Sequence, residues 1–371
     1  MSGVALDLLL QAIPVGFVMF VVLNFGGLLT WVERKQSAIM QDRIGANRAS
    51  ILGFRAMGLF HPLADAIKML TKEDFMPAHA DRFLFQLAPF VSVFFALVAF
   101  ASIPFGDTLS IAGREVQLQA VTLNVGILYV FAMLSLGVYG VMMAGWSSAN
   151  NFALLGGQRA AALMISAEIA IGASIMGVVM VYGSLNLQEI VRGQGQPLLP
   201  GILGDWIPAW GIVTQLPAFF LFLTAGIAAT KRIPFDMPEG ESEIIGYFVE
   251  YSGMKFGMFA MADFLETVVI AGMTTALFLG GWPVPYLMAD GFHFPWGAGV
   301  TLPHLLVVVL QIGSFVVKVC VMIFVMMLIR WTLPRFRYDQ AMRLGWLGLF
   351  PLSILNIVVT GAALLLIGRP S

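Results

Sequence analysis

Apolar and polar residues alternate along this chain in long blocks. Eight of the blocks are predominantly apolar over about 20 residues, the length that an α-helix needs to cross the hydrocarbon core of a bilayer. We therefore predict eight transmembrane helices, at residues 10–31, 83–103, 123–143, 160–182, 209–229, 256–279, 302–329 and 347–367. The polar blocks between them are the predicted loops.

One segment follows another pattern. Between the first and second predicted spans, apolar residues recur at steps of three and four, while polar residues occupy another stripe. This periodicity predicts an amphipathic helix that lies along the membrane surface, either as an anchor or as the wall of a lipid-accessible pocket. Pro62 is expected to kink this helix. The apolar stripe consists of Phe54, Met57, Phe60, Leu63, Ile67 and Leu70, and the polar stripe of His61, Asp65, Lys68 and Lys72.

The composition agrees with a membrane protein. Hydrophobic residues make up 59% of the chain, charged residues 11%, and the mean hydropathy is +0.89, values outside the range of soluble domains. We predict an all-α polytopic membrane protein with one membrane domain over residues 1–371. The first span and the amphipathic helix occupy residues 1–82, and a helix bundle occupies 83–371 with an acidic loop at 230–255. The first apolar block lacks signal-peptide features and is expected to be a retained helix.

Basic residues outside the predicted spans lie mostly on one side. Sixteen Lys and Arg residues fall in the loops of one side and three, Arg114, Arg192 and Arg369, on the other. Because cytoplasmic loops carry the excess of Lys and Arg, we expect both termini to lie outside. Segment 32–82, the acidic loop and the Arg-rich loop before the last span then share the cytoplasmic face.

Other residue types exclude several kinds of site. The net charge of −1 gives no basic field for nucleic acid. A single cysteine, Cys320, cannot hold an iron–sulfur cluster, and the four histidines lack the spacing of a metal site. The chain also contains no phosphate-binding loop, dinucleotide fingerprint or Ser-His-Asp arrangement. We therefore expect no metal and no bound cofactor in this chain.

The loop at 230–255 concentrates acidic residues at the membrane boundary. It carries Asp236, Glu239, Glu241, Glu243 and Glu250. Charge at the membrane boundary is energetically unfavourable, so its concentration here indicates a functional role. A solvated acidic loop is the alternative interpretation.

Four further charged residues lie within predicted spans: Glu168, Asp263, Glu266 and Lys318. A charge at the bilayer centre costs roughly 2.5 to 3.5 kcal/mol on insertion scales, so such residues usually face a bundle interior or a water-filled path. The carboxylates are candidate proton carriers. A static ion pair of Lys318 with one of them is the alternative, although one lysine cannot neutralise three carboxylates.

Several ordered motifs resemble those of one family of membrane proteins. This family comprises the H subunits of bacterial NADH:quinone oxidoreductase, which are equivalent to subunit 1 of mitochondrial complex I. The resemblance covers nearly the whole chain. The motifs are WVERK at 31–35, QDRIGANR at 41–48, LADAIK at 63–68, GWSSAN at 145–150, RIPFD at 232–236, EGESE at 239–243 and PRFRYDQ at 334–340.

This resemblance implies a subunit at the junction of the redox arm and the proton-pumping arm, active only within the complex. It implies that Glu33, Arg34, Asp65, Phe235 and Phe256 line a quinone tunnel beside the acidic loop of Asp236, Glu239, Glu241 and Glu243. Glu168, Glu250, Asp263, Glu266 and Lys318 are then expected on a proton path, and Arg335 and Arg337 at subunit contacts. FMN and iron–sulfur clusters are expected in partner subunits, and quinone, lipid and the other complex I subunits as partners in a bacterial inner membrane.

One motif departs from the family pattern. Where the mitochondrial pattern commonly reads Ala-Glu-Thr-Asn-Arg, this chain reads Ala228-Ala229-Thr230-Lys231-Arg232. Ala229 therefore leaves the expected path one carboxylate short.

Two other functions are consistent with the same residues. The membrane subunit of an energy-converting hydrogenase or formate hydrogenlyase is related to this family but does not use quinone. A stand-alone ion transporter would use the buried charges as its transport site. The extended polar cytoplasmic surfaces favour a docked partner over the transporter.

Overall fold

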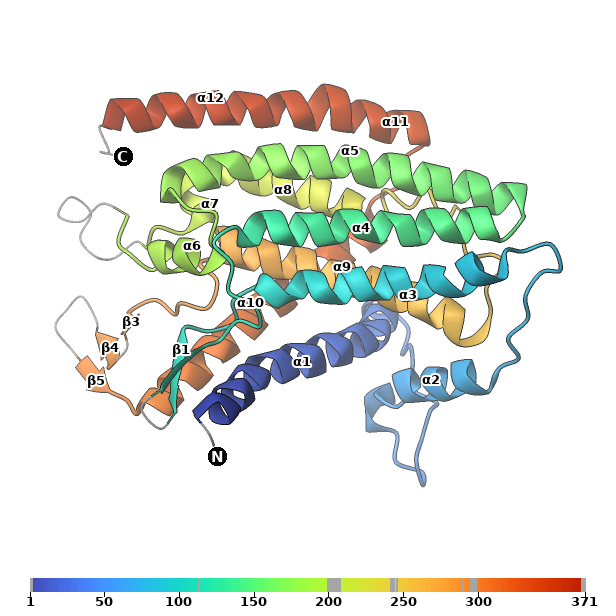
Figure 1. Ribbon diagram of the computed structural model, residues 1–371, viewed down its shortest axis with the longest axis horizontal. Coiled ribbons are helices and arrows are strands. Elements are labelled where there is room, and N and C mark those ends of the chain that lie inside the picture. The colour runs from blue at the N-terminus through green and yellow to red at the C-terminus, as the bar shows by residue number, and fades with distance from the viewer. Residues whose placement is uncertain are drawn as a thin grey trace.

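A computed structural model describes residues 3–111, 114–198, 208–240, 244, 246–288, 290–293 and 299–367. Long helices run side by side across the molecule, and short strands lie near one end (Figure 1). The long helices are α1 (Gly3–Met40), α3 (Arg82–Ala99), α4 (Gly126–Ser147), α5 (Asn151–Tyr182), α9 (Gly253–Phe278), α10 (His304–Thr332) and α12 (Phe350–Ile367). The shorter ones are η1 (Ala56–Gly58), α2 (His61–Thr71), η2 (Phe100–Ser102), α6 (Leu187–Gln194), α7 (Gly211–Thr214), α8 (Leu216–Ala229), α11 (Tyr338–Arg343) and the π-helical turn η4 (Leu344–Leu349).

The described residues include seven helices that are long and apolar enough to cross a membrane. The predicted all-α polytopic fold is therefore confirmed. The remaining predicted span, the fifth along the chain at 209–229, is not one continuous helix. The chain breaks at Gln215, and Pro217 lies in the first turn of α8, where its ring is compatible with a helix and its missing N–H leaves no bond unmade. Helix α8 has 14 residues, about 21 Å, and is short for a span.

Local sequence signals set several helix ends. The Asp81 carboxylate accepts hydrogen bonds from the backbone N–H groups of Phe83 and Leu84, which caps α3. Asn150 caps α5 in the same way. Helix α5 ends at Gly183, whose φ of +69° favours glycine.

Small residues bring the long helices close together. Gly140 of α4 lies against the backbone of α3 at Ser92, and Gly145 of α4 lies against α5 at Ala153. Apolar surface alone gives no driving force between helices in lipid, so close backbone approach of this kind is a main source of their association.

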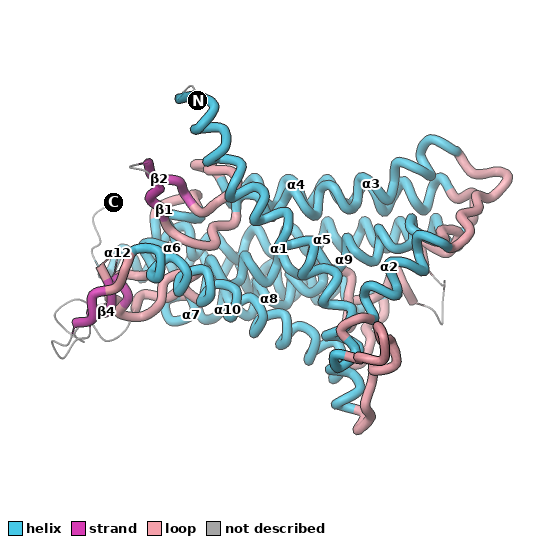
Figure 2. The backbone as a smooth tube through the Cα atoms, turned by 90° about the horizontal axis from the view of Figure 1, so that it is seen from below, coloured by secondary structure: helices cyan, strands magenta, loops and turns pink. Residues whose placement is uncertain are grey.

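Two small antiparallel sheets lie at one end of the bundle. One pairs β1 (Thr108–Ile111) with β2 (Arg114–Gln117), with Thr108 opposite Gln117. The other has the order β3-β4-β5 and consists of Leu287–Met288, Gly291–His293 and Gly299–Thr301. The first residues of α1 and the last residues of α12 also lie at this end (Figure 1). Figure 2 shows the strands at one side of the molecule and the loop between α2 and α3 at the other. The bundle thus has two different polar ends.

The amphipathic helix is present but begins later than the periodicity predicts. Helix α2 starts at His61, with Pro62 in its first turn, and the segment before it forms the 3₁₀ turn η1 with Met57 at a φ of +53°. Pro62 therefore starts the helix and does not kink it, because a first-turn proline leaves no helical hydrogen bond broken. The apolar residues Leu63, Ile67 and Leu70 of α2 are exposed.

Candidate functional site

A charged cavity of about 150 Å³ lies where α1, α9 and α10 meet the loop that follows α8. It is smaller than the roughly 300 to 1,000 Å³ of typical small-molecule sites. A molecule of quinone size does not fit inside this cavity alone and would have to extend beyond it, into space bounded by other walls. Its lining residues are Glu33, Lys231, Arg232, Asp236, Glu239, Phe248, Phe256, Ala260, Asp263, Phe264 and Arg330.

Glu33 joins three elements at this cavity. One carboxylate oxygen lies 3.0 Å from Nη1 of Arg232, in the loop after α8, and the other lies 2.5 Å from Nη1 of Arg330, on α10. The Arg232 guanidinium also lies 4.1 Å above the ring of Phe264, a cation–π contact. Glu33 and Arg232 are largely buried, so this bridge ties α1 and α10 to the loop.

Lys231 forms a second ionic group one residue earlier. Its Nζ lies 2.9 Å from Oδ1 of Asp263 and 3.2 Å from Oε2 of Glu266. The two acids are three residues apart on α9 and therefore share one face of the helix. Burial lowers the pKa of Lys231, but the charges of Asp263 and Glu266 outweigh that effect and raise the pKa above its usual value.

The acidic loop contributes two described carboxyl groups to the cavity, Asp236 and Glu239. Asp236 lies 2.7 Å from Nη2 of Arg335, yet burial outweighs that ion pair and raises the pKa of Asp236. Burial, and then repulsion from Asp263, raise the pKa of Glu239 well above its ordinary range. Tyr247 is fully buried nearby, and burial with the surrounding negative charge raises its pKa as well. Glu241 and Glu243 lie outside the described residues.

The predicted aromatic residues occupy two different places. Phe256 lines the cavity and packs edge-to-face on Phe248, with ring centroids 5.3 Å apart. Phe235, in the loop after α8, is buried and packs against Phe336, with ring centroids 5.4 Å apart. Phe235 is not among the residues that line the cavity.

Arg34 and Asp65 form a separate ion pair beside the cavity. Their atoms Nη2 and Oδ2 are 2.6 Å apart, which links α1 to α2, and Lys68 adds a weaker contact to Asp65 at 3.8 Å. The Arg34 side chain is 47% exposed. Its guanidinium can therefore meet a ligand or a partner subunit.

The other predicted path residues lie apart from the cavity. Glu168 of α5 accepts a 2.7 Å hydrogen bond from Ser135 of α4. Glu250 accepts a 2.7 Å hydrogen bond from Asn150, at the junction of α4 and α5. Arg337, which is expected at a subunit contact and not on the path, is exposed and lies 3.8 Å from Asp339.

Lys318 has a different environment from the one expected in the ion-pair alternative. Its Nζ donates to the backbone carbonyls of Gly281 (2.9 Å) and Pro283 (3.0 Å), and it lies 4.8 Å above the ring of Trp210. The suggested pairing of Lys318 with a buried acid is thus wrong: the lysine satisfies carbonyls that follow the end of α9, and Lys231 pairs with the acids.

Sequence reasoning misses Lys231 and Arg330 as site residues. From the sequence they contribute only to the count of basic residues that predicts the membrane orientation, because positive charges at the ends of spans are ordinary. One feature of the sequence could have identified Lys231: it stands where the family pattern commonly has Asn, within a segment that otherwise largely follows that pattern. Ala229, the residue that departs from the family glutamate, ends α8 and packs against the apolar core.

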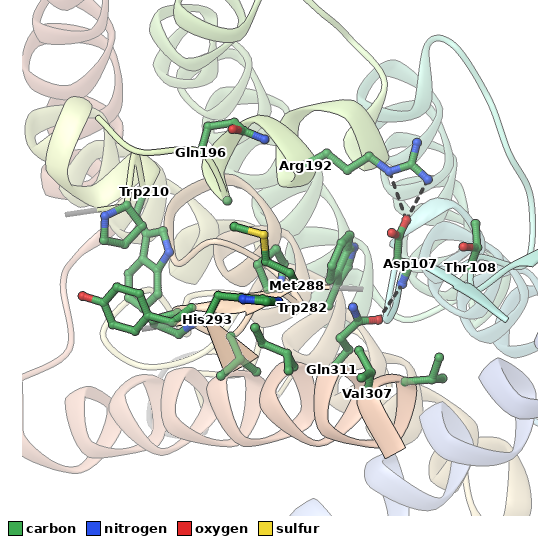
Figure 3. Close-up of a pocket in the computed structure, with 18 of the residues that line it drawn as sticks. Asp107, Thr108, Arg192, Gln196, Trp210, Trp282, Met288, His293, Val307 and Gln311 are labelled. Carbon is green, nitrogen blue, oxygen red and sulfur yellow. Dashed lines mark hydrogen bonds and ion pairs between the residues drawn. The ribbon is translucent and has the colours of Figure 1, made fainter. Parts of the chain in front are cut away.

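A larger cavity, of about 830 Å³, lies at the opposite end of the bundle, near the strands. In Figure 3 Arg192 points to Asp107, whose backbone N–H donates to the side-chain oxygen of Gln311, and Trp210 lies on the opposite side of the cavity. Nη2 of Arg192 is 2.7 Å from Oδ1 of Asp107. None of the predicted site residues lines this second cavity.

Known proteins resemble the chain over nearly its full length. It is 43% identical to the first of the numbered H subunits of NADH-quinone oxidoreductase from Cytophaga hutchinsonii, over 91% of each chain. It is 42% identical to the second such H subunit from Geobacter sulfurreducens, over 99% of this chain and 100% of the relative. It is 43% identical to the NADH-quinone oxidoreductase H subunit of Thermomicrobium roseum over 94% of each. The NADH dehydrogenase family matches residues 13–361, and the chain belongs to that family.

Proposed function

We propose that this chain is the quinone-binding membrane subunit of a proton-translocating NADH-quinone oxidoreductase and that it acts only within the assembled complex. The support comes from full-length relatives that are named as H subunits of that enzyme. The observation that carries the proposal is the convergence of Glu33, Asp236, Glu239, Phe256 and Asp263 on one cavity at one end of the bundle. The resemblance to the family relates these residues to a quinone tunnel, an acidic loop and a proton path.

The small volume of the cavity fits a shared site. A cavity of about 150 Å³ accommodates a few water molecules and a polar head, but not an isoprenoid chain. We propose that partner subunits supply the remaining walls and that α2, with its exposed apolar stripe, borders the lipid-side entrance. FMN and iron–sulfur clusters belong to those partners in this account.

Proton coupling is the second part of the proposal. Quinone reduction takes up two electrons and two protons, so negative charge that develops on the quinone is felt by nearby buried carboxylates. The buried acids of the cavity, together with Glu168 and Glu250, provide a route of titratable groups away from it. Lys318 lies off this route, among backbone carbonyls.

We further propose that the end of the bundle with α2 and the charged cavity faces the cytoplasm of a bacterial cell, with both termini periplasmic. The basic residues concentrate at that end, and partner subunits that carry the redox groups would dock there. Arg335 and Arg337, which follow α10, are then available to meet a partner.

Arg34→Ala tests quinone binding. We expect the variant to lose most quinone reduction by the purified complex, by roughly tenfold or more if a charged hydrogen bond of about 1.5 to 3 kcal/mol is removed. NADH oxidation by a hydrophilic artificial acceptor should remain, because that acceptor takes electrons upstream.

The matched control is Lys72→Met, which removes a cation from an exposed position at the end of α2. If Arg34 is only a membrane-surface anchor, the Arg34→Ala complex will be less abundant, but each assembled complex will reduce quinone at the parent rate. That outcome would contradict the proposed role.

A further inference from the structure

The proposed function leaves the larger cavity, of about 830 Å³, without a role. Its volume falls in the range of typical small-molecule sites, which the charged cavity does not reach. The walls come from α6, from the segment after α9 and from the first turns of α10. Helices α9 and α10 are candidate membrane spans, and the cavity lies where α9 ends at Phe278 and α10 begins at His304. It therefore lies near the level of the lipid headgroups at this membrane surface.

One side of this cavity presents two opposite charges. Nε and Nη2 of Arg192 lie 3.0 and 2.7 Å from the same carboxylate oxygen, Oδ1 of Asp107. Among the described residues, no hydrogen bond or ion pair uses Oδ2 of Asp107 or Nη1 of Arg192. Both side chains are partly exposed and line the cavity. The cavity thus offers a carboxylate acceptor and a guanidinium donor next to each other.

The rest of the lining is largely apolar and aromatic. Trp210 lies across the cavity from the ion pair (Figure 3), and Trp282 and Tyr286 are also among the lining residues. Met288, which lines the cavity, and Leu305, next to the lining residue His304, are exposed apolar residues. Trp and Tyr are enriched at membrane–water interfaces. A cavity with these properties fits a molecule that has a charged head and an apolar body.

Buried polar side chains fix the wall that follows α9. Lys318, from within α10, donates to two backbone carbonyls of segment 281–283 at 2.9 and 3.0 Å and lies 4.8 Å above the ring of Trp210. Gln194, which is fully buried, accepts a 2.9 Å hydrogen bond from the backbone N–H of Gly280. A lysine within a span is unfavourable unless it makes specific interactions. Its use here indicates that the wall has a fixed shape, as a binding site requires.

We propose that this cavity binds the headgroup of a zwitterionic phospholipid of the phosphatidylethanolamine class, with the phosphate at Arg192 and the ammonium group at Asp107. Neighbouring opposite charges in the protein then meet neighbouring opposite charges in the headgroup. An anionic headgroup would be repelled by Asp107 while Arg192 attracts it. The apolar part of the lipid lies toward the aromatic side of the cavity, and Lys318 is a positioning residue for the wall.

Photo-cross-linking in vesicles that contain the purified complex tests this inference. The probe is a phosphatidylethanolamine with a photoreactive group in its acyl chain, and mass spectrometry identifies the labelled peptides. We expect label in segments 283–288 and 304–311. Unlabelled phosphatidylethanolamine should compete about fivefold better than phosphatidylglycerol, the effect of roughly one partly exposed ion pair.

Asp107→Asn separates recognition from a merely structural role of the ion pair. This variant keeps the size of the side chain but removes the charge that meets the ammonium group, so the preference should change in favour of phosphatidylglycerol. A structural role predicts instead that labelling weakens with the preference unchanged. Arg192→Gln should lose labelling by both lipids. Glu189→Gln is the matched control, because Glu189 is an exposed acid on the same helix, α6, and should behave as the parent.

Lys318→Met tests the positioning role. Labelling should weaken while the preference for phosphatidylethanolamine remains, because the wall loosens and the ion pair is intact. Labelling at the parent level in an assembled Lys318→Met complex would contradict this role. If Lys318→Met does not assemble, the competition in the parent and the Asp107→Asn variant still decide the main question.

Three results would overturn the lipid assignment. Equal competition by the two lipids in the parent would mean that the surrounding bilayer is labelled without selection. Full competition by soluble phosphoethanolamine would assign the site to a water-soluble molecule. Cross-links from segments 283–288 and 304–311 to a partner polypeptide in place of lipid would assign it to a protein contact. None of these measurements requires quinone reduction, so failure of the proposed function is distinguishable from failure of this inference.

Discussion

Individual residues at the cavity act mainly through charge pairing. Glu33 is the clearest case, because one carboxylate neutralises two guanidinium groups from distant parts of the chain. Removal of the Glu33 carboxylate leaves both Arg232 and Arg330, which are largely buried, without their carboxylate partner. Loss of one partner of a buried ion pair destabilises a protein by about 3 to 5 kcal/mol. Because Arg330 is partly exposed, we expect the destabilisation to lie at the low end of that range.

We therefore expect Glu33→Gln to reduce the amount of assembled complex severalfold. Quantitative immunoblots of native gels measure this, with Glu115→Gln as the control, because Glu115 is exposed on β2. Normal abundance of the Glu33→Gln complex would show that the bridge contributes little to stability.

The site residues differ in how well the sequence predicts their contacts. The resemblance singles out Glu33, Phe256, Asp236, Glu239 and Asp263, although it assigns them to a tunnel, a loop and a proton path, and in the structure all five line one cavity. The partners of these acids are less predictable. Lys231 and Lys318 are both lysines near apolar blocks, and only the path of the backbone decides which one reaches Asp263 and Glu266.

At the scale of elements, hydropathy predicts the long helices well and the interrupted one poorly. A span of about 20 apolar residues has few alternatives in lipid, because every backbone polar group must be satisfied within the helix. The block at 209–229 meets the same hydropathy criterion, yet Gln215 and Pro217 break it into α7 and α8. Gln215 compensates by donating to Thr360 and accepting from Asn356, both on α12, and those distant partners are not visible in a local pattern.

The contact between α3 and α4 gives an element-scale prediction. A Cβ added at Gly140 would lie 2.8 Å from the backbone nitrogen of Ser92, so the two helices would have to separate. Gly140→Ala should therefore destabilise the subunit by about 1 to 3 kcal/mol, the usual effect of overpacking. Thermal dissociation of the purified complex, followed by loss of this chain, measures the change.

Gly172→Ala is the matched control on α5, because nothing lies within 4 Å of a Cβ added there. Alanine favours the helix over glycine by about 1 kcal/mol, so this variant should be as stable as the parent or slightly more so. Equal stability of the two variants would mean that close α3–α4 packing is not required.

At the scale of the whole molecule, the two ends of the bundle differ in charge and chemistry. The charged cavity lies in the half of the bundle that contains α2, whereas the strands, the start of α1 and the end of α12 lie in the other half (Figure 1). The orientation proposed above can be tested with single cysteines in a Cys320→Ser background. Cysteine at Thr122, an exposed position before α4, should react with an impermeant reagent added outside the cell.

Cysteine at Ala78, an exposed position between α2 and α3, should react only after the membrane is permeabilised. Equal assembly of the two variants is the necessary control. The reverse labelling pattern would place the charged cavity on the outside and would remove the basis for docking of cytoplasmic redox subunits.

The central claim is that buried carboxylates of this chain couple quinone reduction to proton movement. Glu168→Gln and Asp263→Asn keep the size of the side chain while they remove its charge, and Glu189→Gln, an exposed change on α6 at the other end, is the control. The most direct measurement is proton translocation during NADH-driven quinone reduction in closed vesicles that contain equal amounts of assembled complex. The account predicts that both activities fall together in Glu168→Gln and Asp263→Asn and stay at the parent level in Glu189→Gln. Full proton translocation in both Glu168→Gln and Asp263→Asn would contradict it.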